Sequence, residues 1–164
     1  MKADPSSPSD SFSHLDDAGR AQMVRVTGKA DQTRRAVAEG FLRLAPETVE
    51  KLRRQALPKG DVLTVAQVAG ILGAKKTAEL IPLCDLLPLH HVEVRLTPER
   101  DQIRIVGAAE TVGKTGVEME ALTAVVVAAL TLYDMCKAVD KGMSIEGVRL
   151  LKKEKASVVE RTAS

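Results

Sequence analysis

Residues 92–133 read VEVRLTPERDQIRIVGAAETVGKTGVEMEALTAVVVAALTLY, and this segment indicates two strands followed by a long helix. Apolar and polar residues alternate from Val92 to Thr97, which is typical of a half-buried antiparallel strand. After a turn, a second strand is predicted over residues 102–112. The helix is predicted from about Val117 to Asp140, and its middle carries no charge on any side, so we expect it to be buried.

The segments on either side complete an α+β pattern. Upstream, a strand is predicted over 34–44, a short helix begins near Pro46, and a longer helix runs from its N-cap Asp61 to about Leu80. Downstream, a last strand is predicted over 145–152. This order predicts a ferredoxin-like split βαβ sandwich, an antiparallel sheet with helices on one face, plus a short extra helix. We expect another subunit to cover the second face of the sheet.

Length and composition indicate a single domain. The chain has 164 residues, of which 45% are hydrophobic and 28% are charged. Residues 1–22 are rich in Ser, Asp and Pro, and we expect them to form a disordered N-terminal arm. We expect residues 23–153 to form one ferredoxin-like catalytic domain and residues 154–164 to form a flexible tail.

The composition disfavours several classes of protein. Aromatic residues make up only 2% and Trp is absent, so a nucleic-acid surface built on stacked bases is not expected. The two cysteines and three histidines form no cluster, which disfavours a disulfide scaffold and a metal site. No signal peptide is recognisable, and the longest uncharged apolar run has 13 residues, whereas a membrane span needs about 20. We therefore expect a cytoplasmic protein without a membrane partner.

The charge is unevenly distributed. The net charge is +2, with −2 in residues 1–22 and +4 in the remainder. This distribution is a mild bias toward small anionic ligands, although a surplus of solvated lysines would give the same count. The loop Gly113-Lys114-Thr115 precedes the long helix, where backbone N–H groups and a lysine favour an anion. A P-loop needs a glycine five residues before Gly113. Position 108 is Ala, so the loop does not match this motif.

Polar residues bracket the long helix. Glu118 and Glu120 lie at its start, and Asp134 and Lys137 lie three positions apart near its end. The second pair is either a local ion pair or a carboxylate and an amine arranged for proton transfer. Glu120 and Asp134 are separated by roughly 21 Å along a helix axis. Either they contact opposite ends of a long ligand, or they belong to sites completed by a second chain.

Three segments resemble the molybdenum cofactor biosynthesis protein C family: AKKTAELIPLC (74–84), TGVEMEALTA (115–124) and AALTLYDMCKA (128–138). The resemblance covers the chain from about Met23 to Lys153. It implies a lyase, cyclic pyranopterin monophosphate synthase, which converts (8S)-3′,8-cyclo-7,8-dihydroguanosine 5′-triphosphate to cyclic pyranopterin monophosphate and pyrophosphate. It also implies a homohexamer, a trimer of dimers with active sites at subunit interfaces, and no cofactor.

The same resemblance implies roles for individual residues. The catalytic residues would be Asp134, Lys137 and Lys59, and no metal ligand is expected. Arg34 and Lys153 match basic positions suited to hold phosphates. The full set of substrate-binding residues that the resemblance implies is Leu83, Cys84, Asp85, Met119, Glu120, Glu118, Arg34 and Lys153.

Three positions depart from the family pattern. Asp85-Leu86 stands where the family has His-Pro, Arg25 where it usually has Asp, and Glu154-Lys155 where it has a glycine-rich tail. An aspartate at position 85 is an anion beside an anionic substrate. Two hypotheses therefore stay open. One is an active enzyme that tolerates Asp85, and the other is a catalytically impaired relative or His-to-Asp variant that keeps the fold and oligomer and binds nucleotide without efficient turnover.

Overall fold

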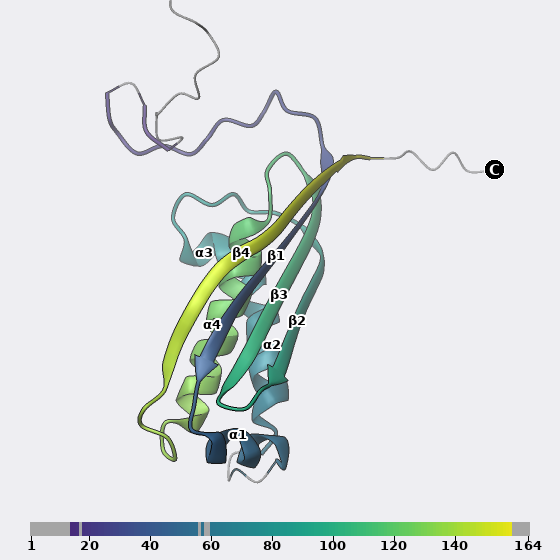
Figure 1. Cartoon of the computed structure of the whole chain (residues 1–164). Helices are drawn as coiled ribbons and strands as arrows, with labels where there is room; N and C mark the ends of the chain where they lie inside the picture. Colours follow the sequence, from purple (N-terminus) through teal and green to yellow (C-terminus); the bar gives the residue numbers. More distant parts are fainter. Residues whose placement is uncertain (1–13, 17, 56, 58–59, 159–164) are drawn as a thin grey trace, which may run out of the picture.

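The fold is seen in a computed structural model, which describes residues 14–158 except residues 17, 56 and 58–59. A four-stranded antiparallel sheet, in the order β2-β3-β1-β4, carries helices on one face (Figure 1). In chain order the elements are β1 (Gln32–Arg43), α1 (Pro46–Arg53), α2 (Val62–Lys75), α3 (Thr77–Leu80), β2 (Leu89–Pro98), β3 (Gln102–Gly113), α4 (Glu118–Cys136) and β4 (Ser144–Ser157). This topology confirms the predicted ferredoxin-like fold.

Helix α4 lies at the centre of the core, where it packs on β1 and β3 beside α2, which packs on β2. Small residues let the backbones approach closely: a Cβ at Gly107 would lie 2.9 Å from the carbonyl oxygen of Ala121, and a Cβ at Gly70 would lie 2.8 Å from that of Ala124. Among the described residues, α4 is the one helix long and apolar enough to cross a membrane. Its contacts with the sheet and with α2 show that it is instead the core helix of this domain.

The helix predicted from Asp61 to about Leu80 is divided into two. Asp61 caps α2 as expected, because its carboxylate accepts a hydrogen bond from the Thr64 backbone N–H at 3.1 Å. The Thr77 hydroxyl donates to the carbonyl oxygen of Ala74 at 2.9 Å. Side-chain bonds of this kind compete with helical backbone bonds. The helix accordingly breaks at this point, and α3 is a separate turn.

Helix α4 ends at Cys136, four residues before its predicted end at Asp140. The carboxylate of Asp140 accepts hydrogen bonds from the backbone N–H groups of Ala45, at 2.7 Å, and Gly142, at 3.1 Å. Asp140 is therefore a buried connection between the end of α4 and the start of α1, rather than a helical residue.

Both ends of the described chain are more structured than their composition indicates. β4 continues to Ser157, where it pairs with Gln32 of β1, so residues 154–157 belong to a strand rather than to the expected flexible tail. At the other end, Leu15 and Ala21 pair across a turn within the segment expected to be a disordered arm. Residues 1–13 and 159–164 lie outside the described part of the chain.

The sheet face away from the helices carries ion pairs. Glu39 is 3% exposed and lies between Arg104 and Arg149. Beside it, Arg35 pairs with Glu110 at 2.9 Å. These ion pairs share the face with Val37, Val106 and Ala108, and the covering subunit stays a prediction.

Candidate active site

The residues predicted to bind substrate gather where β1, β4, the loop after α3 and the start of α4 meet. All eight line one of two adjoining hollows that share Gly116. We call the first the cationic hollow; it is lined by Arg34, Arg35, Gly116, Glu118, Lys153, Glu154 and Lys155. We call the second the acidic hollow; it is lined by His14, Leu83, Cys84, Asp85, Leu87, Thr115, Gly116, Met119 and Glu120.

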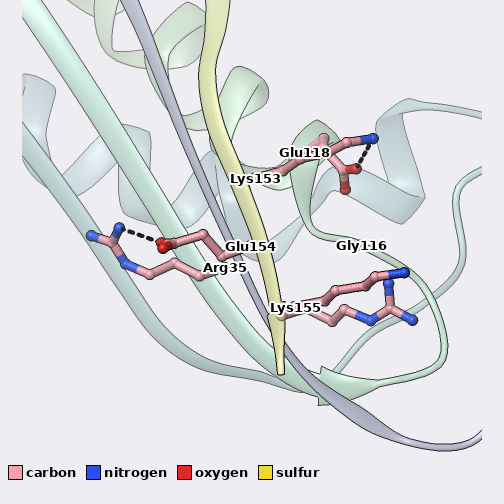
Figure 2. Close-up of a pocket in the computed structure, with 7 residues that line it drawn as sticks. Arg35, Gly116, Glu118, Lys153, Glu154 and Lys155 are labelled. Atoms are coloured by element: carbon pink, nitrogen blue, oxygen red, sulfur yellow. Dashed lines mark ion pairs between the residues drawn. The ribbon is translucent and has the colours of Figure 1, made fainter. Parts of the chain in front are cut away.

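The cationic hollow has a volume of about 230 Å³ and is shown in Figure 2. Arg34 and Lys155 are partners in the register of β1 and β4, so their side chains are neighbours. Lys153 lies 3.6 Å from the carboxylate of Glu118. An Nη of Arg34 donates to the carbonyl oxygen of Lys114 at 3.1 Å. Apart from the ion pair between Arg35 and Glu154, the hollow thus has three cations and one carboxylate, an arrangement that favours a ligand with several negative charges.

Lys155 is missing from the residues predicted to bind substrate, because β4 was expected to end near Lys152. Strand residues two apart lie on the same face, so extending the alternation from Lys153 would have found it. Glu154, on the opposite face, pairs with Arg35 at 3.5 Å (Figure 2). Glu154 and Arg35 therefore neutralise each other's charge within the lining of the hollow.

The acidic hollow, of about 160 Å³, contains one carboxylate, Glu120, and one thiol, Cys84, that hold their protons unusually well. Burial raises the pKa of Glu120, which is 4% exposed, and the nearby Glu118 and Asp85 carboxylates raise it further. Burial also raises the pKa of the Cys84 thiol, with added contributions from Glu120 and Asp85. Cys84 is therefore a thiol rather than an activated nucleophile.

Two buried polar atoms mark the junction of the hollows. Among the described residues, Arg34 Nε and Thr115 Oγ1 are the buried side-chain nitrogen and oxygen atoms without a hydrogen-bond partner. Each belongs to a residue lining one of the two hollows that meet at Gly116. Buried polar groups are nearly always paired, so these atoms point to a ligand that bridges the two hollows. Thr115 also escaped prediction, because no sequence pattern shows that a hydroxyl is unpaired.

The predicted catalytic pair lies at the opposite end of α4. Asp134 and Lys137 form an ion pair at 2.7 Å, and both side chains are more than half exposed. The hydrogen bond from Lys137 to Asp134 raises the pKa of the lysine, so Lys137 is held as a cation. Because α4 is helical throughout, Glu120 and Asp134 lie roughly 21 Å apart along its axis. The third predicted catalytic residue, Lys59, lies outside the described residues.

In the part of the chain that the structure describes, no three or more His, Cys, Asp or Glu side chains come together as a metal-binding group. His90 accepts a hydrogen bond from the Val112 backbone N–H at 3.3 Å. His91 faces Glu110 in the register of β2 and β3. A ligand at the site therefore meets the carboxylates and cations of the two hollows, together with the His14 imidazole, the Cys84 thiol and the Thr115 hydroxyl.

Comparison with known proteins identifies the family. The sequence profile of the MoaC family matches residues 23–156. The chain belongs to the MoaC family. It is 56% identical over 146 residues to the cyclic pyranopterin monophosphate synthases of Chloroflexus aggregans and Rhodospirillum rubrum, which is 88% of this chain and 88% of the Chloroflexus protein. It is 51% identical over 142 residues to the protein of the same name from Peptoclostridium acidaminophilum. The family resemblance seen in the sequence is confirmed.

Proposed function

We infer that the chain is a cyclic pyranopterin monophosphate synthase, a lyase of molybdenum cofactor biosynthesis. The observation that carries this conclusion is the 56% identity with synthases of that name over nearly nine-tenths of the chain. The described site supports it, because the residues implied to bind substrate come from four segments and meet around Gly116. We propose that it acts in the cytoplasm.

The substrate is (8S)-3′,8-cyclo-7,8-dihydroguanosine 5′-triphosphate, and the products are cyclic pyranopterin monophosphate and pyrophosphate. Arg34, Lys153 and Lys155 give the cationic hollow the charge that a triphosphate needs, and they would stabilise the departing pyrophosphate. In the acidic hollow, the carboxylates of Asp85 and Glu120 are suited to accept hydrogen bonds from the N–H groups of the guanine-derived ring. One molecule would then occupy both hollows.

Asp134, Lys137 and Lys59 are assigned to proton transfer and charge stabilisation at a site that a second chain completes. The separation of roughly 21 Å between the two ends of α4 supports a shared site. The assembly would be the homohexamer, a trimer of dimers, that the family resemblance implies. An exposed apolar row on α2, formed by Val65, Val68 and Leu72, offers a surface for subunit packing.

The function is tested by pyrophosphate release from the cyclised triphosphate, with the monophosphate product identified by mass spectrometry. Asp134→Asn and Lys137→Ala are expected to lower kcat at least about 100-fold, as removal of an acid–base group does, without changing the circular dichroism spectrum. Asp101→Asn removes a similarly exposed carboxylate that pairs with Arg43, and it should leave the rate unchanged. Rates near wild type in either α4 variant would remove that residue from the mechanism.

A shared site is tested separately by mixing two inactive variants. Glu120→Gln disables the acidic hollow and Asp134→Asn disables the other end of α4. If each site takes these residues from different chains, mixed oligomers contain some intact sites, and part of the activity returns. A monomer in sedimentation at micromolar concentration, or no recovery on mixing, would contradict the shared site.

The alternative is an impaired enzyme that binds nucleotide without efficient turnover. The observation that favours it is Asp85, whose carboxylate raises the pKa values of both Cys84 and Glu120 and adds negative charge to the substrate hollow. Substrate binding by the wild type without pyrophosphate release would select this alternative. Efficient release would reject it.

A further inference from the structure

One residue of the acidic hollow comes from the N-terminal segment. Of the nine residues that line this hollow, His14 is the one whose side chain can carry a positive charge. The hollow also contains the carboxylates of Asp85 and Glu120 and the thiol of Cys84. His14 is exposed in the single chain, so its imidazole is accessible to a ligand that enters the hollow.

The N-terminal segment is held in place by backbone contacts. The Gln22 backbone N–H donates to the carbonyl oxygen of His14 at 2.9 Å, which closes the turn that carries the histidine. Farther along, Lys114 Nζ donates to the carbonyl oxygen of Thr27 at 3.0 Å. This bond ties the segment to the loop between β3 and α4. Figure 1 shows the segment, in purple, at the end of the molecule where this loop lies.

The acidic hollow repels anions unless a cation compensates. Burial makes the largest contribution to the raised pKa of Glu120, and the smaller contributions of Glu118 and Asp85 show that these two carboxylates place a negative potential at this position. A triphosphate bound in the neighbouring cationic hollow would bring more negative charge close to these groups. Imidazole changes its charge near neutral pH, and its protonated form donates hydrogen bonds from both nitrogens.

We propose that His14 is a substrate-contact residue, whose imidazolium donates a hydrogen bond to the bound substrate and offsets the carboxylates of Asp85 and Glu120. This inference rests on the proposed function, because it requires the substrate to occupy the acidic hollow. It makes the N-terminal segment a part of the binding site. The other titratable groups that line this hollow are Asp85 and Cys84 from the loop after α3 and Glu120 from α4.

The kinetic test compares His14→Gln and His14→Lys with the wild type across neutral pH. Loss of the cation in His14→Gln should raise KM about 10- to 150-fold, as the loss of one hydrogen bond to a charged group does, with a smaller change in kcat. His14→Lys should keep KM near that of the wild type but remove the rise of KM with pH, because a lysine stays charged. His91→Gln, on the open face of the sheet, is the matched control and should behave as the wild type.

A second readout does not depend on turnover. The chain has three histidines, so their ring resonances can be assigned by NMR and followed during titration with GTP, which carries both a guanine and a triphosphate. GTP should shift the His14 signal and leave those of His90 and His91 in place. If the wild type releases no pyrophosphate, the proposed function fails, while the titration still decides the role of His14. An unmoved His14 signal, or an unchanged KM in His14→Gln, would overturn the inference.

Discussion

Replacing Glu39 by Gln is expected to destabilise the fold strongly, although Glu39 is remote from both hollows. Its side chain is 3% exposed on the open face of the sheet. One carboxylate oxygen accepts hydrogen bonds from Arg104 Nε and Nη2 at 3.0 and 2.8 Å. The other accepts from Arg149 Nε and Nη2 at 2.9 and 2.6 Å. The hydrogen bonds from Arg104, and then those from Arg149, hold the pKa of Glu39 below its usual range.

The size of the effect follows from the exposure of the partners. Breaking a buried ion pair typically costs about 3–5 kcal/mol, because a charge is left without compensation. Here the two arginine side chains are 42% and 67% exposed, so water can solvate them when the carboxylate is lost. We therefore expect Glu39→Gln to lower the free energy of unfolding by about 2–3 kcal/mol, which is less than the loss of a fully buried ion pair typically costs.

Urea denaturation at neutral pH and a fixed protein concentration would measure this loss. Glu110→Gln is the matched control, because that carboxylate is 38% exposed and pairs with Arg35, and such pairs contribute about 1 kcal/mol or less. Since folding lowers the pKa of Glu39, its contribution is complete above the ordinary glutamate pKa and is lost as the pH falls through the lowered value. Equal losses in the two variants would refute the reasoning.

Two further predictions concern the site and the core. Asp85→His should raise pyrophosphate release severalfold or more without changing the oligomer, because it removes a carboxylate from the acidic hollow; an unchanged rate would place Asp85 away from the reacting centre. Gly70→Ala should lower the free energy of unfolding by about 1–3 kcal/mol, because the new methyl group would collide with the backbone of α4. Gly28→Ala, where no atom lies within 4 Å, is its control, and similar urea midpoints for both variants would contradict this account.

Alternation and turn residues were sufficient to predict the sheet. The strands that face the core begin and end within a few residues of their predicted limits, because one face of each must be apolar. β4 was predicted too short, because its last residues are charged and their pairing with β1 leaves no apolar pattern. The end of α4 was missed for a similar reason: the bonds from Ala45 and Gly142 to Asp140 are tertiary contacts that composition does not reveal.

The candidate site was predictable where the family resemblance covers it and not elsewhere. Eight residues taken from the resemblance come together around Gly116, although their roles remain predictions. His14 lies in a Ser- and Asp-rich segment, and only its position in space shows that it lines the same hollow as Asp85. Thr115 was visible as part of a glycine-containing loop, yet its lack of a hydrogen-bond partner is a property of the packed structure.

The charges of the acidic hollow connect the roles of His14 and Asp85. If both side chains face the same ligand, the benefit of the imidazolium depends on the negative charge that it offsets. In an Asp85→His background that charge is smaller, so removing His14 should raise KM by a smaller factor than it does beside Asp85. Side chains that share a partner show such non-additivity, whereas independent sites add. Equal factors in the two backgrounds would mean that His14 and Asp85 act on separate parts of the ligand, and that the imidazolium does not balance the carboxylate.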